Sequence, residues 1–220
     1  MKTLTLRWSG VLGAVFLTGT LLAGCGASPK APAAPATTLP PPAGTPVSGQ
    51  YGIASTSTAS YTAHERFLQD NLPNVPVGVT HGVSGPLLLT GGRFEPSTVT
   101  VNLIGLKTDS SMRDRHVQQT LDTARYPDAT FQITGEASNA QLVRAQGVAA
   151  VRLQGKLTIH GVTHAATWAL DVGLVGGDLK VTGTTTIQMT AFGVRPPNLA
   201  GFVKVQPTIL LSVDLEAAKS

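Results

Sequence analysis

The sequence predicts an all-β domain, either a closed antiparallel barrel or a sandwich of about eight strands, with one short helix. Three observations support this prediction. Apolar and polar residues alternate with a period of two in several segments, glycine turns separate these segments, and one polar stretch alone has helical spacing. Strands with such alternation bury one face and leave the other in water.

The alternation is clearest in residues 98–103, 130–134 and 151–160. In a closed barrel the apolar phase of each strand must point inward, because the outside faces water. The residues expected inside, and therefore expected to contact an interior ligand, are Val99, Val101, Leu103, Phe131, Ile133, Val151, Leu153, Leu157 and Ile159.

The remaining strands are expected in residues 61–67, 82–90, 162–172, 179–191 and 203–215, listed here in chain order. Gly161 predicts a tight turn, and Gly176, Gly177 and Asp178 predict a second one. Pro207 suggests a bulge or an edge position, because proline cannot donate a hydrogen bond to a neighbouring strand.

Residues 110–121 break the strand pattern. They begin with a serine, a favoured first residue before a helix, and place Met112, Val117 and Leu121 at helical spacing. We therefore expect one short helix here. Residues 126–128, with their central proline, then return the chain to a strand.

Residues 1–24 are predicted to form an export signal. Lys2 and Arg7 precede an apolar run, and the only cysteine of the chain, Cys25, follows Leu22, Ala23 and Gly24. This order resembles the bacterial lipobox, so we expect Cys25 to be acylated, for example with palmitate, and to anchor the chain to a cell-envelope membrane. A lone cysteine also excludes an internal disulfide.

Residues 25–57 are expected to form a linker, because their Pro- and Ala-rich beginning cannot bury a core. Residues 58–217 then form one domain of ordinary size. Loss of Lys2 and Arg7 with the signal lowers the formal charge from +4 to +2, and no basic run follows, which argues against nucleic-acid binding. No common catalytic fingerprint is present, so we expect neither enzymatic activity nor a cofactor.

Several motifs, in one order, resemble the YceI-like family of polyisoprenoid-binding proteins. They lie at residues 106–110, 113–116, 126–131, 155–164 and 191–194. The resemblance implies an exported, lipocalin-like, eight-stranded antiparallel barrel that binds a long apolar lipid of the polyisoprenoid or isoprenoid quinone type. The alternative is a cell-envelope interaction module whose barrel is packed and holds no ligand.

The charged residues of the predicted helix have two possible interpretations. Arg113, Arg115 and His116 form either a solvated face with local ion pairs or contacts to a polar head group such as pyrophosphate. His160 and His164 flank the Gly161 turn without a third histidine or a cysteine nearby, so we expect exposed turn residues and no metal site.

Overall fold

The structure, a computed structural model, describes residues 41–67, 69, 72–199 and 203–220 of the chain. The predicted signal peptide, Cys25 and the first part of the predicted linker lie outside these residues. Within the described ranges, no helix is long and apolar enough to cross a membrane.

Strands make up most of the described chain, as the alternation predicts. The elements are β1 Ala43–Pro46, β2 Gly49–Ile53, β3 Thr58–Thr62, β4 Glu65–Phe67, β5 Pro73–Asn74, β6 Val77–Thr80, β7 Val83–Ser84, β8 Pro86–Thr90, β9 Arg93–Phe94, β10 Thr98–Asn102, α1 Ser111–Thr120, β11 Asp128–Glu136, β12 Arg144–Gln146, β13 Val148–Ile159, β14 Val162–Val175, β15 Asp178–Gln188, the 3-10 turn Met189–Phe192, β16 Asn198–Leu199, β17 Val203–Val205 and β18 Thr208–Lys219.

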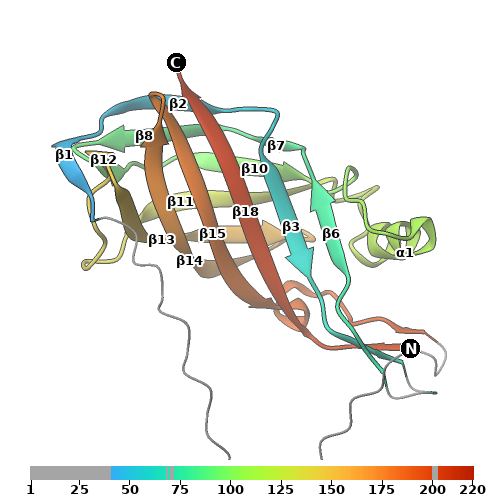
Figure 1. The fold of residues 1–220 in the computed structure, drawn as a ribbon. Helices are drawn as coiled ribbons and strands as arrows, with labels where there is room; N and C mark the ends of the chain where they lie inside the picture. Colours follow the sequence, from blue (N-terminus) through green and yellow to red (C-terminus); the bar gives the residue numbers. More distant parts are fainter. Residues whose placement is uncertain (1–40, 68, 70–71, 200–202) are drawn as a thin grey trace, which may run out of the picture. The chain divides into compact units, whose positions relative to one another are not determined.

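Each strand of the main sheet runs antiparallel to its neighbours (Figure 1). From β10 the pairing proceeds through β11, β13, β14 and β15 to β18. One end of β18 then pairs with β2 and the other with β3. These two strands pair in turn with β8 and β6.

The sheet closes on itself through the run from β6 to β8. Val83 and Ser84 of β7 pair with Val101 and Thr100 of β10, and only Gly85 separates β7 from β8. Eight strand positions surround the barrel. Two of them are made of successive short strands, β2 with β3 and β6 to β8, and the other six are β10, β11, β13, β14, β15 and β18. The predicted eight-stranded antiparallel barrel is therefore confirmed.

Gly85 is required at this closure. Its φ of +124° disfavours other residues, and a Cβ there would lie 2.4 Å from the carbonyl oxygen of Thr98. Its own carbonyl accepts a hydrogen bond from the backbone of Ile53 at 3.3 Å. The glycine thus lets three strand segments meet at one point.

The predicted boundary of the linker at residue 57 is wrong, because β1 and β2 lie within it. β2 fills the gap between β18 and β8, and Tyr51 at its centre is only 2% exposed. The short segment from Gly49 to Ile53 carries no clear local alternation. It becomes a strand because residues 217–219 of β18 would otherwise have no hydrogen-bonding partner on this side.

The helix forms where it was predicted. Ser110 precedes α1 and its hydroxyl accepts a hydrogen bond from the backbone N–H of Arg113 at 3.4 Å. Asp114 is buried and accepts hydrogen bonds from the backbone N–H and the hydroxyl of Thr108, at 2.7 and 2.8 Å. These bonds hold the pKa of Asp114 below its usual value and fasten the preceding loop to the helix.

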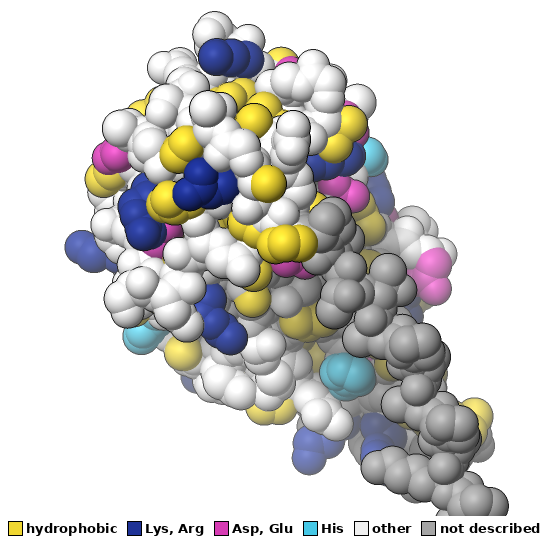
Figure 2. Space-filling model, turned by 60° about the vertical axis from the view of Figure 1, so that its left-hand side comes forward, with side chains coloured by type: hydrophobic (Ala, Val, Ile, Leu, Met, Phe, Trp, Pro, Cys, Tyr) yellow, Lys and Arg dark blue, Asp and Glu magenta, His cyan; other side chains and the backbone are white. Residues whose placement is uncertain are grey.

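The interior of the barrel is packed at one end. Side chains there are between 0 and 2% exposed: Tyr51, Val143, Ala149, Val151, Val172, Leu179 and Ala217. The separate two-stranded sheet of β1 and β12 lies at this end (Figure 1). On the outside, Figure 2 shows apolar side chains scattered among polar and charged ones, as expected for strands that face water.

Candidate binding cavity

The other end of the barrel is hollow. A cavity of about 360 Å³ lies inside it, and most of the residues that line it are apolar. This volume falls in the range of small-molecule sites, which are typically about 300–1,000 Å³. Since the opposite end is packed, the cavity is a pocket with one blind end.

Eight of the nine residues predicted to face a ligand line this cavity. They are Val99, Val101, Leu103, Phe131, Ile133, Leu153, Leu157 and Ile159. Val151 also points inward but lies in the packed end, where it is 2% exposed, and it does not line the cavity.

Other lining residues were missed by the sequence analysis. Leu211 and Val213 of β18 and Ile187 of β15 line the cavity and are partly buried. The signal in β18 was hidden, because Leu210 follows Ile209 and interrupts the alternation even though its side chain points outward and is 38% exposed.

The mouth of the cavity lies between α1 and β4. Met112 on the helix and Phe67 on the strand both line the cavity, yet they are 60% and 38% exposed. Val117 and Leu121, on the inner side of the helix, continue the apolar lining inward. A long ligand could therefore enter at this mouth and extend toward the packed end.

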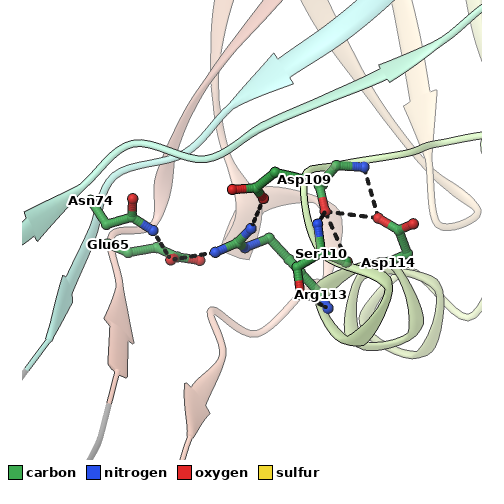
Figure 3. A network of polar contacts seen from close by, with 7 residues as sticks. Glu65, Asn74, Asp109, Ser110, Arg113 and Asp114 are labelled. Carbon is green, nitrogen blue, oxygen red and sulfur yellow. Dashed lines mark hydrogen bonds and ion pairs between the residues drawn. The ribbon is translucent and has the colours of Figure 1, made fainter.

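Polar side chains gather at the mouth (Figure 3). Arg113 of α1 forms an ion pair with Asp109, and its Nη2 atom lies 3.8 Å from Oε2 of Glu65 on β4. Asn74 of β5 donates a hydrogen bond of 2.9 Å to the same Glu65 oxygen. This network joins the helix, across the opening, to the small sheet that β16, β17, β4 and β5 form in that order.

Tyr61 lines the cavity beside this network. Its hydroxyl is buried and has no hydrogen-bond partner among the described residues. Burial raises the pKa of Tyr61 to about 12, although the nearby Arg113 opposes the shift. The phenol is therefore uncharged at neutral pH.

The three predicted head-group residues are placed differently. Arg113 and His116 line the cavity and are half-buried, whereas Arg115 is exposed and does not line it. Arg113 also forms ion pairs with Asp109 and Glu65. The pair with Asp109 is local, as the solvated-face interpretation predicted.

The two turn histidines pack against neighbours. His160 has a φ of +52° in the Gly161 turn and its ring centroid is 4.8 Å from that of Tyr126. His164 places Nε2 2.8 Å from the carbonyl oxygen of Ala191. Within the described ranges, no three His, Cys, Asp or Glu side chains are grouped as metal ligands would be.

A family model for the YceI-like domain matches residues 61–217. UPF0312 proteins from two Pseudomonas putida strains are each 28% identical over 135 residues, which is 57% of this chain and 64% of theirs. The match thus spans less than two thirds of these relatives.

Two solved structures share the fold. Burkholderia cenocepacia BcnA has a TM-score of 0.59 and 20% identity, covering 76% of this chain and 99% of that protein. A polyisoprenoid binding domain from Saccharophagus degradans, implicated in plant cell wall breakdown, has a TM-score of 0.60 and 18% identity, covering 79% and 100%. At these identities the similarity shows a common fold.

Proposed function

This chain belongs to the YceI-like domain family, and on that premise we propose that its barrel holds one long apolar lipid of the polyisoprenoid or isoprenoid quinone type. The protein binds this lipid without chemically changing it. The acyl group predicted on Cys25 keeps the domain beside a membrane, outside the cytoplasm.

The apolar cavity, blind at one end and open at the other, carries this proposal. Burying a hydrocarbon chain there is favourable by roughly 25 cal/mol per Å² of apolar surface removed from water. Polar residues occur at the mouth, where Glu65, Arg113 and His116 line the opening. This polarity suits a lipid that enters chain first and leaves its head group at the mouth.

The shape of the cavity also favours a slender ligand. Phe131 and Trp168 line it from neighbouring regions of the wall, with ring centroids 6.2 Å apart and nearly perpendicular. These rings narrow the interior. An unbranched or regularly methylated chain fits such a space better than a fused ring system does.

Membrane tethering follows from the chemistry of such a ligand. Long isoprenoid lipids reside in bilayers, so a binding domain must stay close to that reservoir. The proline-rich beginning of the linker suits a semi-rigid spacer.

The test is to express the full chain in bacteria and measure bound lipid by native mass spectrometry and solvent extraction. Val101→Phe places bulk inside the cavity, whereas Thr100→Phe places the same bulk on the other face of β10. We expect lipid in the wild type and in Thr100→Phe, and at least about fivefold less in Val101→Phe, because the ligand and the added ring compete for one space. A wild type without lipid would favour the interaction-module alternative.

A further inference from the structure

We propose that the cavity mouth selects lipids with an uncharged head group, and that Glu65 and Asp109 exclude phosphorylated lipids. This inference rests on the proposed lipid-binding function and adds the class of head group to it. It also assigns a role to two carboxylates for which the sequence analysis had none.

Arg113 is the only Lys or Arg side chain among the described residues that line the cavity. This guanidinium, whose side chain is 22% exposed, therefore supplies the only fixed positive charge that these lining residues offer to a phosphate at the mouth. However, Arg113 already forms ion pairs with Asp109 and Glu65 (Figure 3). A phosphate would have to displace a carboxylate that the fold holds in place.

Glu65 is well placed to repel an anion. It lines the cavity, its side chain is only 11% exposed, and Asn74 holds its carboxylate at 2.9 Å. Glu65, Asp109 and Arg113 together carry a net formal charge of −1. The nearby Lys107 does not offset this charge, because it lies 3.8 Å from Asp114 and is neutralised by it.

The surroundings strengthen this repulsion. Charges in a partly buried, largely apolar site are screened less than charges in open water. An uncharged hydroxyl adds no charge to the mouth and can donate a hydrogen bond to the Glu65 carboxylate. A prenyl alcohol therefore suits this mouth better than the corresponding prenyl phosphate.

Two lipids with the same chain test the inference, with geranylgeraniol as the alcohol and geranylgeranyl phosphate as the anion. The chain has two tryptophans, so Trp8→Phe leaves Trp168, which lines the cavity, as the single fluorophore. Each lipid is titrated into the purified full-length Trp8→Phe chain at pH 7, and Trp168 fluorescence reports binding. We expect the alcohol to bind at least about tenfold more tightly than the phosphate.

Three variants in the same background locate the selectivity. Glu65→Gln and Asp109→Asn each remove one negative charge, and we expect each to reduce the preference for the alcohol at least about threefold. Asp171→Asn removes an exposed carboxylate from β14, away from the mouth, and should leave the preference unchanged. Thermal unfolding verifies that each variant is folded. The Asp109 side chain is 81% exposed, so Asp109→Asn tests the charge effect even if Glu65→Gln disturbs folding.

The outcomes are distinct. Equal or tighter binding of the phosphate, or a preference that neither Glu65→Gln nor Asp109→Asn reduces, overturns the head-group inference and leaves the lipid-binding proposal standing. Binding of neither lipid overturns both.

Discussion

Asp114 is a carboxylate with little access to water, and its environment favours the charged form. Two hydrogen bonds from Thr108 lower its pKa, and Lys107 acts in the same direction from 3.8 Å. The residue is not at the cavity. Its hydrogen bonds hold the loop before α1 against the helix, and Arg113, one residue earlier on α1, lies at the mouth.

This leads to a pH-dependent prediction for Asp114→Asn. A group whose pKa is lowered on folding stabilises the protein above its ordinary pKa, here 3.8, and loses that contribution as the pH falls through the folded-state value. We expect the variant to be less stable than the wild type at pH 7, with the difference shrinking below pH 3.8. Urea unfolding at pH 7, 5 and 3 measures it, with Asp171→Asn as the exposed control. A difference that stays constant across this range would contradict the prediction.

Gly155 lies on the buried phase of β13, where a residue without a side chain would be expected to leave room for a ligand inside the barrel. The structure shows that it leaves none. A Cβ at Gly155 would lie 2.4 Å from the Gln132 carbonyl oxygen and 2.5 Å from the Phe131 ring, which covers the glycine. The site is filled by a neighbouring strand.

We therefore expect Gly155→Ala to lower the free energy of unfolding by about 1–3 kcal/mol, because the backbone and the Phe131 ring must shift. Gly52→Ala is the matched control, since the nearest heavy atom to its new methyl group is Ser220 Oγ at 3.6 Å. Chemical denaturation of both variants measures the difference. Equal stability of the two would show that the wall at Gly155 adapts easily.

At the scale of elements, whether a segment forms a strand depends on its pairing partners as much as on its own sequence pattern. β13 alternates strictly along its length and pairs with β11 and β14 on its two sides. β2 has little alternation and still occupies a central position, because β8 and β18 both need a neighbour. Pro207 divides the predicted last strand into β17 and β18, and its carbonyl accepts a hydrogen bond from the backbone of Met189 at 2.8 Å.

Two deletions test where the folded domain begins. Removing residues 26–37 should leave the thermal midpoint nearly unchanged, because this proline-rich composition cannot form a core. Removing residues 26–53 also removes β2 and the buried Val47 and Tyr51, and should lower the midpoint by about 10 °C or more. Thermal unfolding followed by circular dichroism measures both. Equal midpoints for the two deletions would show that β2 does not stabilise the barrel.

At the scale of the whole molecule, the barrel divides into a packed end and a hollow end. The packed end supplies stability through side chains such as Tyr51 and Val172, which are 2% and 0% exposed. The hollow end leaves Val99, Val101 and Val213 partly exposed to the cavity. A barrel built in this way can stay folded while the cavity fills and empties.

The proposed membrane anchor also concerns the whole chain. We predict that Cys25→Ser releases the protein from membranes or leaves its N-terminal segment uncleaved, because the thiol is the acceptor of the acyl group in the lipobox pattern. Membrane fractionation and the intact mass of the mature chain measure these effects. A variant with unchanged partition and unchanged mass would contradict acylation at this residue.

Much of the barrel wall could be predicted from local pattern. Period-two alternation is a property of neighbouring residues, so it predicted the inward phase of β10, β11 and β13, and the serine at position 110 predicted the start of α1. Eight of the nine residues chosen in this way line the cavity. The family motifs decided between the two forms that this pattern allowed, in favour of the closed barrel.

The sequence by itself thus determined the strand phases, the helix and the family, because each is carried by residues close together in the chain. Only the tertiary structure decided which inward residues enclose a cavity and which pack, since this depends on what each meets across the barrel. Val151 and Leu153 share one phase of β13, yet only Leu153 lines the cavity. Likewise the partners of Arg113 include Glu65, which lies far from it in sequence and reaches it only because β4 and α1 form opposite sides of one mouth.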